Sequence, residues 1–239
     1  MKKILILLLI LVFCSTVNAA GILRGVLSSS SISGPTCTGS SPVCMGRETF
    51  NTCNAACSSG CDNKWVTDIG AGTCNDTTSP APLEGTQSFG GLTSSDNMIH
   101  TALATAQSSL YVAAEVYIVT YTTGSPGIIF VNNSYTSTIA GIRAVGSNQY
   151  SKMNSGSSYI APATVPIGSK FYFKFYAATG TGSNALLKWW TSTDGKTWTL
   201  QQTSSNGTWT SLIAQVGMEW DAENTIIDDI RWDSQDINY

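Results

Sequence analysis

Charged side chains and histidine are scarce in this sequence. Only 11% of its 239 residues are Asp, Glu, Lys or Arg, and His100 is the one histidine. The sequence therefore offers no Ser-His-Asp set, and it has no glycine-rich phosphate loop. Its few basic residues form no stripe, so we expect no nucleic-acid partner.

Long apolar runs are also scarce. One such run, Ile4–Phe13, follows Lys2 and Lys3 and precedes the small-residue site Val17-Asn18-Ala19. This order is typical of a secretory signal peptide, here residues 1–19, and the run is too short to span a bilayer. Because no second run approaches about 18 residues, we predict no membrane span. We expect a protein secreted to the extracellular space, the periplasm or the cell surface.

Cysteine is absent after Cys74. Without the signal peptide, six cysteines remain, together with ten basic and 15 acidic residues, a net charge of −5. An even number of cysteines in an exported chain favours disulfides over zinc. Lipid attachment at Cys14 is an alternative that the bulky Phe13 disfavours. The segments expected after the signal peptide are a flexible lead (20–34), a disulfide-stapled module (35–76), a linker (77–85) and one larger domain (86–239).

Alternation of apolar and polar residues dominates 86–239. In "KFYFKFYAA", Phe171, Phe173 and Phe175 share one face of a strand, and "SLYVAAEVYIVTY" alternates in the same way. The Asp-Gly pair in "TDGK" predicts a hairpin turn. There is no sustained helical period. So many strands must stack or close to remove their edges, which predicts an all-β sandwich or jelly roll.

Two stretches resemble a known superfamily. "KFYFKFYAATGTGSNALLKWWTSTDGKTWTL" and "VGMEWDAENTIIDDIRW" are similar to the concanavalin A-like, laminin G-like jelly roll. That resemblance implies a concanavalin-like β-sandwich over 86–239. The superfamily includes lectins, adhesion modules and glycosidases, so it leaves the function open.

The cysteine-rich segment resembles a Kazal-type protease-inhibitor domain in "CTGSSPVCMGRETFNTCNAAC" and in the distant Cys74. The family's first cysteine is missing and Cys61 is extra. The residue matching the specificity position is Gly39, which has no side chain to insert into a protease. Serine-protease inhibition therefore stays an alternative to a spacer or interaction module. The pairs implied by the resemblance are Cys37–Cys53, Cys44–Cys74 and, as the remainder, Cys57–Cys61.

Three carboxylates alternate in "EWDAE": Glu219, Asp221 and Glu223. This matches the Glu-x-Asp-x-Glu pattern of laminarinase-like glycosidases, in which the outer glutamates are nucleophile and acid/base. On a flat strand the outer Cα atoms lie about 13 Å apart, whereas retaining chemistry needs carboxyl groups about 5–5.5 Å apart. The surrounding residues do not match that family, so catalysis by these residues is an alternative hypothesis.

Calcium is a further hypothesis for the same row. Glu219, Asp221 and Glu223 supply hard oxygen ligands close to a turn. Asp228 and Asp229 follow in "TIIDDIRW", where strand alternation predicts that they point to opposite faces. We expect no other cofactor.

Aromatic residues on the strands indicate a sugar-binding surface. Since Phe171, Phe173 and Phe175 make the better core, the opposite face should expose Tyr172, Lys174 and Tyr176, with Trp190 nearby. Most other aromatic residues should pack in the core or at its rim. The leading hypothesis is an exported, non-catalytic recognition protein. Its expected partner is a glycan or another extracellular protein ligand.

Overall fold

The computed structural model describes residues 45–54, 59–69, 82–90, 97–119, 127–134, 137–146, 149–154, 163–164, 166–204, 207–220 and 225–239. The chain divides into two compact units, Met1–Pro35 and Thr36–Tyr239, and every described residue belongs to the second. These residues form strands, turns and bends, with no helix among them. Accordingly, they contain no helix long and apolar enough to cross a membrane.

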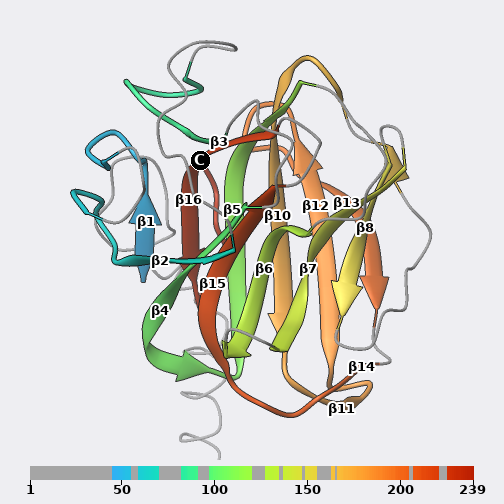
Figure 1. Ribbon diagram of the computed structural model, residues 1–239. Coiled ribbons are helices and arrows are strands. Elements are labelled where there is room, and N and C mark those ends of the chain that lie inside the picture. Colours follow the sequence, from blue (N-terminus) through green and yellow to red (C-terminus); the bar gives the residue numbers. More distant parts are fainter. Residues whose placement is uncertain are drawn as a thin grey trace, which may run out of the picture. The chain divides into compact units, whose positions relative to one another are not determined.

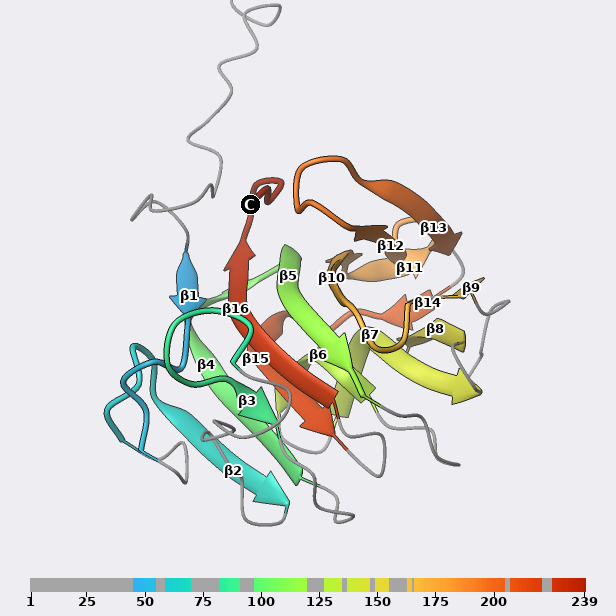
Figure 2. The ribbon, with the colours of Figure 1, turned by 90° about the horizontal axis from the view of Figure 1, so that it is seen from above.

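Two antiparallel sheets form the layers of the second unit (Figures 1 and 2). The first sheet has the order β1 (Gly46–Glu48), β16 (Thr225–Asp233), β5 (Ser109–Ile118), β10 (Lys170–Ala178), β12 (Leu186–Ser192) and β13 (Thr199–Ser204), with β3 (Phe89–Gly90) also on β16. The second has the order β2 (Trp65–Ile69), β4 (Asn97–Gln107), β15 (Ile213–Trp220), β6 (Gly127–Ser134), β7 (Ser137–Gly146), β8 (Gln149–Asn154) and β9 (Ala163–Thr164). A small separate pair joins β11 (Gly180–Gly182) to β14 (Gly207–Trp209).

The hydrophobic core lies between the sheets. Phe171, Phe173 and Phe175 of β10 are fully buried, as the alternation predicted, and they belong to one cluster with Val216 and Met218 of β15. Burial of each such side chain contributes about 1.5–3 kcal/mol. The predicted β-sandwich is therefore confirmed, and the opposite face of β10 is left for other contacts.

The described part of the cysteine-rich segment adds an edge strand to each sheet. β1 pairs with β16, and β2 pairs with β4. The buried carboxylate of Glu48 links the two strands, because it accepts hydrogen bonds from Trp65 Nε1 at 3.0 Å and from the backbone N of Asn63 at 2.9 Å. β1 is thus held against the sandwich, although the boundaries of a stapled module stay a prediction.

Cys53 and Cys61 form a disulfide. This corrects the pairing that the Kazal resemblance implied, in which Cys53 would bond Cys37 and Cys61 would bond Cys57. The observed bond joins residues eight positions apart, so the two implied pairs that involve Cys53 and Cys61 are wrong. The other four cysteines, Cys37, Cys44, Cys57 and Cys74, lie outside the described residues.

A β-bulge interrupts β16. The register with β5 shifts between Asp228 and Arg231, and Asp229 has a φ of 40°. The extra residue reverses the strict alternation. Ile227 and Ile230 enter the core cluster, whereas Asp228 and Asp229 both contact groups outside it. The prediction that the two aspartates point to opposite faces is therefore wrong.

Candidate ligand-binding site

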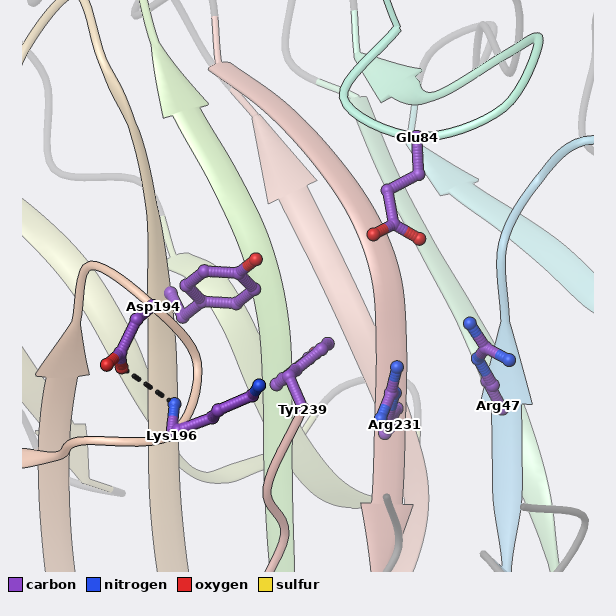
Figure 3. Close-up of a pocket in the computed structure, with 7 residues that line it drawn as sticks. Arg47, Glu84, Asp194, Lys196, Arg231 and Tyr239 are labelled. Carbon is purple, nitrogen blue, oxygen red and sulfur yellow. Dashed lines mark hydrogen bonds between the residues drawn. The ribbon is translucent and has the colours of Figure 1, made fainter. Parts of the chain in front are cut away.

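A pocket of about 400 Å³ opens beside the outer face of the first sheet. Figure 3 shows its walls. They come from β1, the segment before β3, β10, the β12–β13 turn, β16 and the C-terminal segment. The lining residues are Arg47, Glu84, Tyr172, Asp194, Lys196, Arg231 and Tyr239.

The bulge places Asp229 between two arginines. Arg47 Nε lies 2.5 Å from Asp229 Oδ1, and Arg231 bonds both oxygens of the same carboxylate, with Nε 3.1 Å from Oδ1. Asp229 is fully buried. Its hydrogen bond raises the pKa of Arg47, while burial acts against this. Both guanidinium groups are therefore held in place by one buried carboxylate.

Tyr239 closes one side of the pocket. Its ring lies 4.0 Å from the Arg231 guanidinium carbon and 4.8 Å, between centroids, from the ring of Tyr172. Its hydroxyl donates to the carbonyl oxygen of Asp229 at 2.6 Å. Burial raises the pKa of Tyr239 well above its usual value, so the phenol stays neutral.

The β12–β13 turn supplies Asp194 and Lys196, and it joins the two strands as the Asp-Gly pair predicted. The Asp194 carboxylate accepts hydrogen bonds from the backbone N of Lys196 at 2.8 Å and of Thr197 at 2.7 Å, which hold its pKa well below the usual range. Gly195 has a φ of 70°, and a Cβ there would lie 2.6 Å from Tyr239 Cβ. Glycine is thus required by both the turn and the close approach of Tyr239.

Glu84 lies at the opposite wall, in a segment fixed by the buried Asp228. Asp228 Oδ2 accepts hydrogen bonds from Ser88 Oγ at 2.7 Å and from the backbone N of Glu84 at 3.0 Å. Burial raises the pKa of Asp228 to about 7. Burial, followed by repulsion from Glu115 and Asp229, also raises the pKa of Glu84. The Glu84 carboxylate has no hydrogen-bond or ionic partner among the described residues, so it is available to a ligand.

A second buried acid, Glu115, influences the pKa of Tyr172. Lys170 Nζ lies 2.9 Å from Glu115 Oε1, and Glu115 is fully buried. Burial and the neighbouring Glu115 carboxylate raise the pKa of Tyr172 to about 12. The phenol therefore enters the pocket as a neutral ring and hydroxyl.

Comparison with known proteins supports the fold. No protein-family model matches the chain, and no curated protein matches it in sequence. The exoplasmic/lumenal domain of VIP36, in its Ca²⁺- and mannose-bound form, is 8% identical with a TM-score of 0.51, over 82% of this chain and 92% of that one. The chain shares the β-sandwich fold of this domain.

Two further structures are similar at lower scores. An endo-β-1,4-glucuronan lyase from the fungus Trichoderma reesei is 10% identical with a TM-score of 0.47, over 73% of this chain and 89% of that one. Carbohydrate-binding module CBM66 from Bacillus subtilis is 14% identical with a TM-score of 0.45, over 71% and 95%.

The face expected to be exposed on β10 is largely covered in this sandwich. Tyr172 lines the pocket but is 8% exposed, and Lys174 is 3% exposed. Lys174 Nζ donates to Asp236 Oδ1 at 2.7 Å and to the carbonyl oxygen of Ile237 at 3.0 Å, because the C-terminal segment lies over it. The expected exposure of these two residues is therefore wrong.

Tyr176 and Trp190 are not among the residues that line the pocket. Both are half-buried, with the Tyr176 ring 4.6 Å from that of Tyr111. The backbone of Glu219 pairs with Met98 in the second sheet, whereas the pocket lies on the first. The Glu219 side chain, Asp221 and Glu223 are outside the described residues, so their catalytic and calcium roles remain predictions.

Most pocket residues gave no signal in the sequence. Arg47 and Glu84 fell in the predicted module and linker, and Tyr239 belongs to no motif. The sequence motifs "TDGK" and "TIIDDIRW" correctly predicted a turn and a strand, but they did not indicate that these segments supply pocket residues. Charged residues are rare in this chain, yet several lie together in those two motifs. That clustering could have indicated Asp194, Lys196 and Arg231 as candidate binding residues.

Proposed function

We propose that the protein recognises carbohydrate through this pocket without catalysing a reaction. The observation that carries the proposal is the half-buried ring of Tyr239, packed against Tyr172, next to the side chains of Glu84 and Lys196, which have no ionic partner among the described residues. A sugar ring packs its C–H face on an aromatic ring. Its hydroxyl groups donate to a carboxylate and accept from an ammonium group, and such charge-assisted hydrogen bonds are strong.

The size and rigidity of the pocket support this proposal. Its volume of about 400 Å³ falls within the range of about 300–1,000 Å³ typical of small-molecule sites. Arg231 is held by the buried carboxylate of Asp229, and the Tyr172 ring packs against that of Tyr239. Side chains that are fixed before binding lose little conformational entropy when the ligand arrives.

Recognition is favoured over catalysis because the buried acids beside the pocket already accept hydrogen bonds from groups of the protein itself. Asp229 is held by two arginines, and Asp228 accepts hydrogen bonds from Ser88 and from the backbone of Glu84. The proposal places the protein outside the reducing cytosol. The Cys53–Cys61 disulfide supports that location, since such bonds persist in oxidising compartments.

A glycan array tests the proposal. The protein lacking residues 1–19 is applied with and without Ca²⁺, because the row Glu219, Asp221 and Glu223 is our proposed calcium site. We expect binding to at least one glycan, and loss of most of that binding in a Glu84→Ala, Lys196→Ala double variant. Asp62→Ala, Lys64→Ala is the matched control, since both residues are exposed and neither lines the pocket. Absence of binding to every glycan in both conditions rejects the proposal.

A further inference from the structure

We infer that the pocket selects acidic saccharides, whose carboxylate or sulfate groups would bind at Arg47 or at Lys196. This rests on the proposed function and adds the ligand class. It follows from which charged groups of the pocket already have partners and which remain available.

Arg47 has donors to spare. Its Nε donates to Asp229, and its two terminal nitrogens have no acceptor among the described residues. The side chain is 32% exposed and lines the pocket. A guanidinium group presents paired N–H donors in a plane, which matches the geometry of a carboxylate or a sulfate.

Lys196 is the second available cation. Its backbone N is bonded to Asp194, but its ammonium group has no acceptor within the described part of the chain. The residue is exposed, and its side chain runs toward Tyr239 in Figure 3. The two available cations therefore come from different walls of one pocket.

The remaining charges of the lining are already engaged. Arg231 is bonded to Asp229 and to the carbonyl oxygen of Asn238. Asp194 accepts hydrogen bonds from the backbone N of Lys196 and of Thr197, and from the hydroxyl of Ser192. Glu84 is the one lining acid without a partner among the described residues. The N–H donors of Arg47 and Lys196 that lack acceptors among the described residues favour a ligand that brings acceptor oxygens, as a carboxylate or a sulfate does.

Glu84 should have two opposite effects on the binding of an acidic saccharide. Its carboxylate can accept hydrogen bonds from ligand hydroxyls, which helps every saccharide. Its charge also repels an anionic group bound to Arg47, whose guanidinium it influences electrostatically. Removing that charge should therefore favour acidic ligands relative to neutral ones.

The test compares three forms of each of three tetrasaccharide backbones: β-1,4-glucose, β-1,4-mannose and α-1,4-galactose. Each is used neutral, oxidised at C6 to the uronate, and sulfated at O6. We expect an acidic form of at least one backbone to bind about tenfold more tightly than its neutral form at low salt. That preference should fall when the ionic strength rises from about 0.01 M to about 0.15 M. The uronate and sulfate arms identify which anion is preferred.

Two single variants test the assignment to residues. Lys196→Gln should weaken binding of the acidic form about fivefold and that of the neutral form less, whereas Lys64→Gln should change neither. Glu84→Gln should raise the ratio of acidic to neutral affinity, with Asp62→Asn as its control. All four positions are exposed, and thermal unfolding checks that each variant is folded.

Three results overturn the inference. The first is equal affinity for neutral and acidic forms, which leaves the proposed recognition of carbohydrate intact. The second is an equal effect of Lys196→Gln and Lys64→Gln on the acidic form. The third is absence of binding to all nine ligands, which, together with a silent array, rejects the proposed function as well.

Discussion

Asp228 should make the protein less stable as the pH rises toward neutrality. The carboxyl group is fully buried beneath the segment 82–90 and accepts hydrogen bonds from Ser88 Oγ and from the backbone N of Glu84 and of Asp229. Burial is the largest influence and raises its pKa from 3.8 to about 7, although these hydrogen bonds lower it. The substitution that tests this is Asp228→Asn, which removes the charge and keeps the shape.

The sign follows from proton binding. Between pH 3.8 and about 7 the folded protein keeps a proton that the unfolded chain releases. Stability therefore falls with rising pH across this window, by about 1.4 kcal/mol per pH unit. The full effect is about 4 kcal/mol, of which about 2.5 kcal/mol lies between pH 5 and pH 8. Repulsion from Glu115 acts in the same direction.

Urea unfolding at pH 5 and pH 8 measures this difference. The wild type should lose about 2.5 kcal/mol of unfolding free energy between these values, and Asp228→Asn should lose much less. The pH dependence, not the absolute stability, is the test, because both carboxylate oxygens accept from backbone N–H groups and the amide NH2 of the variant must face one of them. Asp62→Asn, at an exposed site, should keep the wild-type dependence. An equal loss in wild type and Asp228→Asn refutes the reasoning.

Three further substitutions test the frame around the pocket. Replacing Cys53 and Cys61 by serine should lower the unfolding free energy by about 2–3 kcal/mol and weaken ligand binding, because β1 carries Arg47; calorimetry measures both effects. Gly195→Ala should cost about 1–3 kcal/mol, since its Cβ would meet Tyr239; normal thermal stability contradicts this. Glu48→Gln should also destabilise, by about 2–4 kcal/mol, because its amide would face the indole donor of Trp65; urea unfolding decides.

Local pattern was enough to predict the β10 core face and the β12–β13 turn. Both depend on residues a few positions apart, such as Phe171, Phe173 and Phe175, whose alternation is fixed by strand geometry. The contact between Arg47 and Asp229 joins residues 182 positions apart. No local rule pairs β1 with β16, so the wall that Arg47 supplies could not be predicted.

The bulge in β16 shows why even a recognised strand gave a wrong site. "TIIDDIRW" was correctly taken as a strand, but one extra residue at Asp229 turns both aspartates away from the core. The two aspartates then contact different groups of the protein. Asp229 holds the arginines, and Asp228 anchors the segment that carries Glu84. The pocket's electrostatics therefore depend on a backbone irregularity.

The C-terminal segment has two opposite effects on the binding face. It covers Lys174, whose ammonium group lies 4.3 Å from the centre of the Trp198 ring and is bonded to Asp236, so this stretch of β10 is closed to ligands. The same segment brings Tyr239 against Tyr172. The aromatic surface expected along β10 is thus reduced to its Tyr172 end, where Tyr239 adds a second ring. A variant that displaced Tyr239 would expose Lys174 but remove a pocket wall, so it should lose affinity rather than gain it.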